Sequence, residues 1–256
     1  MLIRNLVENI RHQNWFVVWI EFLIVVFGVF IGIQVSNWND ARIDSTRARA
    51  YLERIQSDID ADILGYQDHL AFWSAVSKYG AIGLDYANDQ NESSYDPWEL
   101  LLAYFQASQV AAYYTTRATY DELKSSGELG LIHYLKLRNA LAYYYTNAGN
   151  PALTERPIYR EHVRGVIPIN IQTYIWERCF RSDELGIQTM LDCDAPDDTD
   201  KLADVVRAIG SNESLMAELR YWMSTMQVAM IIGRSQMANA RRLRDSIQEQ
   251  LDGQAQ

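Results

Sequence analysis

Residues 16–35 read FVVWIEFLIVVFGVFIGIQV, and this stretch decides the fold class more than any other part of the chain. Its only ionisable side chain is Glu21. Twenty helical residues, at about 1.5 Å each, are long enough to cross the ~30 Å apolar core of a bilayer. We therefore predict a transmembrane helix over residues 15–36. A short amphipathic interfacial segment, residues 1–14, precedes it, and a helical extramembrane domain, residues 37–256, follows it.

A cleavable signal peptide is the first alternative for this stretch. The apolar region of a signal peptide is usually about 7–15 residues long and is followed by small residues with A-x-A-like spacing. Here the apolar run is longer, and the chain continues as VSNWN over residues 35–39. These features favour a retained membrane anchor.

One face of the predicted span differs from the others. At about 100° per residue, a helical wheel places five residues on this face: Glu21, Val25, Gly28, Gly32 and Ser36. A small-xxx-small pattern lets two helices approach closely in lipid, and a carboxylate facing hydrocarbon is costly. We expect the face to turn toward a partner helix, either a second copy of the chain or another membrane protein. A chance glycine pair, or a role for Glu21 in moving protons or ions, is the alternative.

The rest of the chain predicts an all-α domain of about seven helices. Apolar residues recur at a mean spacing near 3.6 over residues 48–73 and again over residues 215–247, which is typical of long amphipathic helices. We expect these long first and last helices to pack antiparallel. Between them, Asp96 is a candidate helix start ahead of a run to residue 114, Thr119 and Glu122 have capping-box spacing, and Gly127 is a candidate stop.

Charge and cysteine content restrict the partners and the compartment. The chain has a formal net charge of −10, so its acidic domain is expected to repel nucleic acid. Its two cysteines, Cys179 and Cys193, are fourteen residues apart on either side of a polar turn. This spacing predicts a disulfide and favours an oxidising compartment, with two unrelated buried thiols as the alternative. More arginines follow the span than precede it, and this count alone would place the large domain on the cytoplasmic side. Long domains, however, translocate largely regardless of charge.

No stretch of the sequence contains a motif that indicates a particular chemical reaction. Nucleophile-elbow, phosphate-loop and dinucleotide-binding patterns are lacking in the sequence, and we expect neither a cofactor nor a catalytic residue. The acidic segment DCDAPDDTD, residues 192–200, could hold Ca²⁺, although a plain solvated loop is the favoured interpretation. Asp58, Asp60 and Asp62 fit a solvated helix face better than an EF-hand. The Ca²⁺ candidates are Asp192, Asp194, Asp197 and Asp198.

Two sets of motifs carry a family resemblance. LIVVFGVFIGIQVSNWNDAR with the following YLERIQSDID, and TYDELKSSGELGLI with LRNALAYYY, lie within about the first 145 residues. In these motifs the chain resembles a family of uncharacterised bacterial single-pass membrane proteins. The resemblance implies one span and a helical domain, located at the bacterial inner membrane, and no assigned activity. Because of the predicted disulfide, we expect the large domain to lie in the periplasm.

The sequence thus favours a non-enzymatic, membrane-anchored interaction or scaffold module. It would self-associate through its span and present an acidic domain to a partner. An extracytoplasmic ligand-binding sensor or enzyme with a pocket in the helical domain is the main alternative. An ion-coupling assembly that uses Glu21 is a further one.

Overall fold

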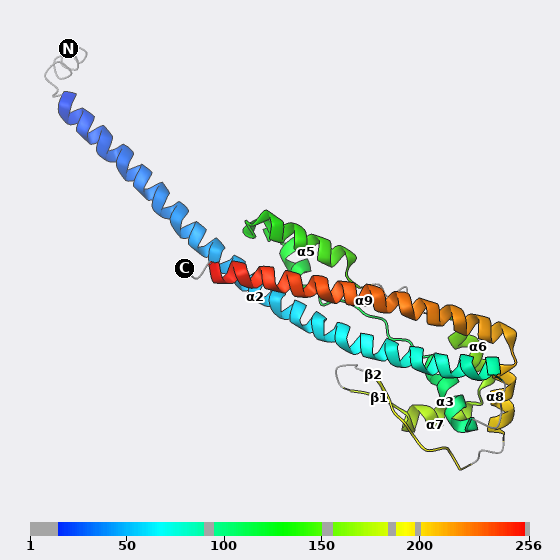
Figure 1. Cartoon of the computed structure of the whole chain (residues 1–256). Helices are drawn as coiled ribbons and strands as arrows, with labels where there is room; N and C mark the ends of the chain where they lie inside the picture. Colours follow the sequence, from blue (N-terminus) through cyan, green and yellow to red (C-terminus); the bar gives the residue numbers. More distant parts are fainter. Residues whose placement is uncertain (1–14, 90–94, 150–155, 184–187, 198–200, 254–256) are drawn as a thin grey trace, which may run out of the picture. The chain divides into compact units, whose positions relative to one another are not determined.

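The computed structural model describes residues 15–89, 95–149, 156–183, 188–197 and 201–253 (Figure 1). The predicted interfacial segment, residues 1–14, therefore lies outside the described residues. The chain forms two compact units, Met1–Leu52 and Glu53–Gln256, which we describe separately.

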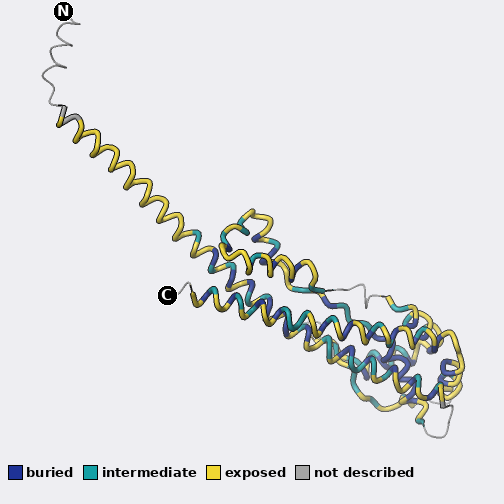
Figure 2. The backbone as a smooth tube through the Cα atoms, turned by 45° about the horizontal axis from the view of Figure 1, so that its top comes forward, coloured by how far each residue is buried: buried dark blue, intermediate teal, exposed yellow. Residues whose placement is uncertain are grey.

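One helix, α2 (Trp15–Asp89), makes up the described part of the first unit and continues into the second. It has 75 residues and no proline, so no residue in it lacks a backbone N–H or forces a kink. The helix runs without a break past residue 36, the predicted end of the span. Its segment within the first unit is exposed over most of its length (Figure 2).

The second unit is helical, as the sequence predicts. Across the described residues the chain has eight α-helices, and the all-α prediction is confirmed. A single antiparallel hairpin of three-residue strands was not predicted. After α2 the elements are α3 (Pro97–Ala107), α4 (Ala118–Ser125), the 3₁₀ turn η2 (Glu128–Leu131), α5 (Leu135–Asn147), α6 (Ile158–Val166), α7 (Ile169–Arg178), β1 (Phe180–Ser182), β2 (Gln188–Met190), α8 (Leu202–Gly210) and α9 (Glu213–Gly253).

The part of α2 that follows residue 52 packs antiparallel against α9, which confirms the predicted pairing of the long helices. Both helices place a stripe of buried residues on the facing sides (Figure 2). Their order along the chain is opposite, as four neighbouring pairs show: Gln56 with Gln248, Asp60 with Arg244, Trp73 with Gly233, and Gly83 with Leu219.

Local signals between the long helices are partly confirmed. Asp96 caps α3, since its Oδ1 accepts from the backbone N–H of Trp98 at 2.7 Å and of Glu99 at 3.1 Å. Gly127 has a φ of 75° directly after α4, in the left-handed region where a side chain is strained. The capping box is wrong, because Thr119 lies inside α4 and Arg117 is its N-cap.

Helix α3 is shorter than predicted. It ends at Ala107, and residues 108–117 form an irregular, partly buried segment that we call the 108–117 segment. Ser108 is the C-cap, and its Oγ donates to the Phe105 carbonyl at 2.6 Å. The contacts described below explain why the helix stops here.

Two glycines of α2, Gly80 and Gly83, allow close packing and predict different responses to Ala. A Cβ on Gly83 would lie 2.6 Å from Cε1 of Tyr104, a fully buried ring whose hydroxyl donates to the Gly83 carbonyl. The three heavy atoms nearest to a Cβ on Gly80 all belong to the flexible, half-buried side chain of Met223, which can move aside.

We expect Gly83→Ala to lower the free energy of unfolding by about 1–3 kcal/mol through overpacking. Gly80→Ala is the matched control, because both substitutions gain about the same helix propensity of ~1 kcal/mol. It should leave stability unchanged or raise it. Urea unfolding of the full chain in detergent, followed by tryptophan fluorescence, measures both. Equal unfolding midpoints for the two variants would contradict the packing role of Gly83.

Candidate functional site

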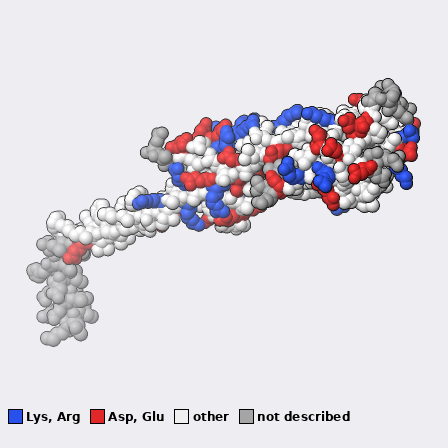
Figure 3. All heavy atoms as spheres, turned by 90° about the horizontal axis from the view of Figure 1, so that it is seen from below, with Lys and Arg blue, Asp and Glu red and all other residues white. Residues whose placement is uncertain are grey.

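The N-terminal part of α2 is long and apolar enough to cross a membrane. An 18-residue window in it has a mean hydropathy of 2.1, and none of that window is buried. Figure 3 shows the contrast in charge: this stretch is almost free of Lys, Arg, Asp and Glu, whereas the second unit carries both signs densely.

All members of the predicted association face lie on this stretch and are exposed: Glu21, Val25, Gly28, Gly32 and Ser36. No heavy atom outside the local helix backbone would lie within 4 Å of a Cβ placed on Gly28 or Gly32. The two glycines therefore leave a shallow strip on the helix that another helix backbone could approach.

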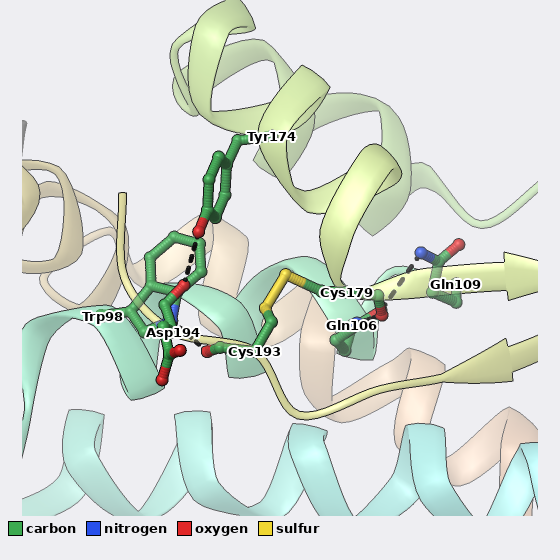
Figure 4. Close-up of a disulfide and its surroundings, with 7 residues drawn as sticks. All are labelled: Trp98, Gln106, Gln109, Tyr174, Cys179, Cys193 and Asp194. Atoms are coloured by element: carbon green, nitrogen blue, oxygen red, sulfur yellow. Dashed lines mark hydrogen bonds between the residues drawn. A yellow bond between two sulfur atoms is a disulfide. The ribbon is translucent and has the colours of Figure 1, made fainter. Parts of the chain in front are cut away.

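The predicted cysteine pair is a disulfide. Cys179 and Cys193 are bonded, with their Cα atoms 5.2 Å apart (Figure 4). Cys179 is the C-cap of α7, immediately before β1, and Cys193 follows β2. The bond therefore closes the β1–β2 hairpin at its base, where the Leu191 N–H also donates to the Cys179 carbonyl at 2.8 Å.

Side chains of α3 connect this hairpin base to the core (Figure 4). Gln106 donates to the Cys179 carbonyl at 3.1 Å, and the Trp98 indole donates to the Cys193 carbonyl at 2.9 Å. Cys179 itself is fully buried. The disulfide is thus part of the packed core.

The acidic loop candidates are dispersed in the described residues. Asp192, Asp194 and Asp197 are exposed, and Asp198 lies outside the described residues. Where side chains are described, no three His, Cys, Asp or Glu residues gather as metal ligands would. The loop's Ca²⁺ site stays a prediction.

A more organised set of polar contacts surrounds the 108–117 segment, which is irregular yet passes through the core. Buried backbone N–H and C=O groups need partners, and an irregular segment cannot supply them to itself. Here side chains from three helices, α2, α6 and α9, supply partners to the segment and to the last residue of α3. The contacts are Trp222 to the Ala107 carbonyl (2.8 Å), Arg160 to the Ser108 carbonyl (2.9 Å), Trp73 to the Ala111 carbonyl (3.0 Å), His69 to the Ala112 carbonyl (3.2 Å) and the Thr116 N–H to Asp62 (2.7 Å). In the other direction, the Tyr113 hydroxyl of the segment donates to the Asp62 carbonyl of α2 at 3.0 Å.

Asp62 is the most unusual member of this set, and the prediction that it lies on a solvated helix face is wrong. Its side chain is 2 % exposed. One carboxylate oxygen accepts from the Thr116 N–H and the other accepts from the Tyr144 hydroxyl at 2.6 Å. Asp62 therefore joins α2, the 108–117 segment and α5.

Burial raises the pKa of Asp62, and the hydrogen bonds from Thr116 and Tyr144 oppose this shift without cancelling it. Burial also raises the pKa of Tyr144, and the neighbouring carboxylate adds to that rise. The sequence did contain a signal for this position. Asp62 is three residues after Ile59 and four before Tyr66, so it lies on the buried stripe of α2.

Several hollows lie on the described surface of the second unit. One, of about 760 Å³, lies between the start of α6 and the first turns of α9, beside the exposed Ile158 and Tyr221. At its margin Glu218 accepts from Ser214 at 3.4 Å and pairs with His162 at 2.9 Å. The hydroxyl thus contacts the carboxylate and not the imidazole, which is not the order of a serine nucleophile and its base.

A second hollow, of about 670 Å³, lies between α2, the 108–117 segment and Gln188 of β2. His69 lines it, with Nδ1 2.8 Å from the Gly65 carbonyl and Nε2 3.2 Å from the Ala112 carbonyl. Both partners are acceptors, so only a doubly protonated ring can donate to both. These contacts give His69 a structural role at the edge of this hollow.

No family model matches the chain, and neither a curated protein nor a solved structure is significantly similar to it. The resemblance seen in the sequence motifs therefore stays a prediction.

Removal of the disulfide is expected to lower the stability of the protein. Closing a loop of about fifteen residues restricts the unfolded chain and stabilises a protein by ~3 kcal/mol. The double variant Cys179→Ala, Cys193→Ala should therefore unfold at a clearly lower urea concentration than the wild type. Protein purified without reductant and denatured should show no thiol that reacts with maleimide. Two reactive thiols, with unchanged stability in the double variant, would contradict a structural bond.

We expect substitutions of Asp62 to lower the stability by different amounts. Asp62→Ala leaves the buried Tyr144 hydroxyl without its acceptor and should cost about 1–3 kcal/mol. Asp62→Asn keeps the shape, can still accept from the Thr116 N–H, and should cost less. Equal losses in the two variants would show that these hydrogen bonds are unimportant.

The pH dependence of this difference follows from the raised pKa of Asp62. The folded state holds the proton of Asp62 more tightly than the unfolded state, whose ordinary pKa is 3.8. Ionisation of Asp62 therefore favours unfolding as pH rises above 3.8. The stability of the wild type relative to Asp62→Asn should fall from acid pH toward the raised pKa, and urea unfolding at several pH values measures it.

Proposed function

We propose that this protein is a membrane-anchored helical interaction module that self-associates through the N-terminal part of α2. The observation that carries the proposal is the exposed face of Glu21, Gly28 and Gly32 on a helix with the length and composition of a membrane span. Without a hydrophobic force between helices in lipid, close backbone approach at small residues is a main source of association. Contact along this face also removes Glu21 from lipid.

The second unit would then act as the presented domain. Its described surface is densely charged, and the whole chain has a net charge of −10, so a partner with a basic surface is favoured. The Cys179–Cys193 bond supports an oxidising compartment. Together with the motif resemblance, this supports an inner-membrane protein with its large domain in the periplasm.

Ligand binding is a second candidate, favoured by the hollow of about 760 Å³ between α6 and α9. Ligand sites are concave and mostly apolar with a few polar groups, and this hollow combines Tyr221, Trp222 and Val228 with Glu218. A sensor would use such a site to alter how the domain contacts its partner. The proposals are compatible, because one concerns the span and the other the domain.

The association proposal is tested by enlarging the small residues. Gly28→Ile and Gly32→Ile should separate the helices and weaken the oligomer by about 1 kcal/mol or more each, since both remove close packing. The measurement is chemical crosslinking in native membranes, with particle mass in mild detergent as the second readout. Val26→Phe is the matched control, because it adds bulk on the opposite side of the helix.

A reduced oligomer in both glycine variants, with a normal oligomer in the Val26→Phe control, is the expected result. An unchanged particle mass in both glycine variants would overturn the role of this face. A wild-type particle containing one copy of the chain and no other membrane protein would overturn association as a whole.

A further inference from the structure

Two arginines of α6, Arg160 and Arg164, lie one helical turn apart, and both are half-buried. Such spacing places the two side chains on the same face of the helix. Two like charges at this spacing repel each other. The pair therefore needs an explanation beyond ordinary surface charge.

Both guanidiniums bind the beginning of the 108–117 segment. Arg160 donates from one nitrogen to the Ser108 carbonyl at 2.9 Å and to Gln109 Oε1 at 3.4 Å. Arg164 donates to Ser108 Oγ at 2.9 Å and to the same Gln109 oxygen at 3.1 Å. The shared amide oxygen brings the two cations close together. Several N–H groups of each guanidinium have no acceptor among the described residues.

No carboxylate neutralises these cations within the described part of the chain. The ion pairs there use other basic residues, and every partner of Arg160 and Arg164 is neutral. This is unexpected in a chain with 33 acidic and 23 basic residues. A half-buried charge normally has a partner of opposite sign.

Aromatic rings lower the energetic cost of burying Arg164 but do not neutralise its charge. The guanidinium carbon of Arg164 lies 4.5 Å from the centre of the Phe105 ring and 5.0 Å from that of Trp176. The end of α3 nearby also favours a cation through the helix dipole. These contacts fix the orientation of Arg164, yet both formal charges remain.

The backbone carbonyls in this region do not need a cationic hydrogen-bond donor. Trp222 and Trp73 donate to the carbonyls of Ala107 and Ala111 in the same region with neutral indoles. An arginine pair at Ser108 and Gln109 therefore brings two charges to a place where a neutral donor would satisfy the same oxygen.

We propose that Arg160 and Arg164 form a binding site for a phosphate group. Two adjacent guanidiniums with unused N–H donors match the anionic oxygens of a tetrahedral phosphate in charge and in hydrogen-bonding geometry. Since both side chains are partly exposed, the anion can reach them from solvent. A soluble molecule and a lipid headgroup can both carry such a phosphate, and the two share the recognised chemistry.

The protonation of Arg164 agrees with this site. Burial, together with the charge of Arg160, lowers the pKa of Arg164 to about 9. A bound anion would reverse the effect of the neighbouring cation and hold both guanidiniums charged.

The test uses the full chain in phosphatidylcholine nanodiscs. Inorganic phosphate is titrated against sodium chloride at equal ionic strength, and thermal unfolding and calorimetry report binding. A second arm replaces part of the lipid with phosphatidylglycerol and omits free phosphate. The variants are Arg160→Gln and Arg164→Lys, which keeps the charge but loses the planar fork. Arg220→Gln, at an exposed position of α9, is the matched control.

We expect saturable stabilisation of the wild type and of Arg220→Gln, with affinity reduced about tenfold or more in both α6 variants. Such a loss seen with free phosphate identifies a soluble ligand, and one seen only with phosphatidylglycerol identifies a lipid headgroup. Either supports the site. If Arg160→Gln does not fold, Arg164→Lys carries the comparison. Absence of stabilisation in both arms, or an equal response in all variants, overturns the proposal.

Discussion

The second unit depends on one constraint: an irregular segment passes through its core and cannot pair its own backbone. Side chains from α2, α6 and α9 provide the partners. A buried carbonyl or N–H without a partner costs roughly 1–3 kcal/mol. Each of these contacts therefore holds a helix at a defined distance from the segment. The antiparallel pair of α2 and α9 supplies a large part of the buried apolar side chains, whereas the 108–117 segment connects α2, α6 and α9 through its backbone hydrogen bonds.

The same constraint explains the position of the polar residues in the core. Trp73 and Trp222 are large apolar side chains with a single donor each, so they fill space and bind a carbonyl at once. Asp62 performs the reverse task, since it accepts from a backbone N–H and a tyrosine. Two further side chains of α3, Gln106 and Trp98, donate to the carbonyls of the two bonded cysteines. Neutral donors and one carboxylate thus account for most buried contacts, and the arginine pair is the exception.

The sequence predicted features that depend on local pattern. The 3.6-residue spacing predicted the long helices, and Asp96 and Gly127 marked an N-cap and a left-handed turn because their chemistry acts within a few residues. It did not predict the end of α3, where periodicity continues past Ala107 but the partners of the chain lie far away in sequence. Trp222 is 115 residues from the carbonyl that it binds. Asp62 was misassigned for the same reason, since its acceptor role depends on Tyr144, 82 residues later. The pairing of the cysteines was predicted correctly, but the short hairpin between them was not, because three-residue strands are too short to show alternation.

Helix α2 meets two different physical requirements with one continuous backbone. In the second unit it is amphipathic, and its buried stripe includes Ile55, Ile59 and Val76, each fully buried. In the first unit it is apolar on nearly every side, and large side chains such as Phe22, Val29 and Ile31 remain about three-fifths exposed. A helix that is apolar all round is stable only where something else covers it, and lipid covers side chains but does not bind a carboxyl group well. In the proposed membrane setting, lipid covers the bulky apolar side chains well. Contact with another helix would remove Glu21 from lipid and fill the strip left by the glycines. The composition of this stretch therefore argues for an anchor, and the unequal distribution of residues around it argues for an assembly.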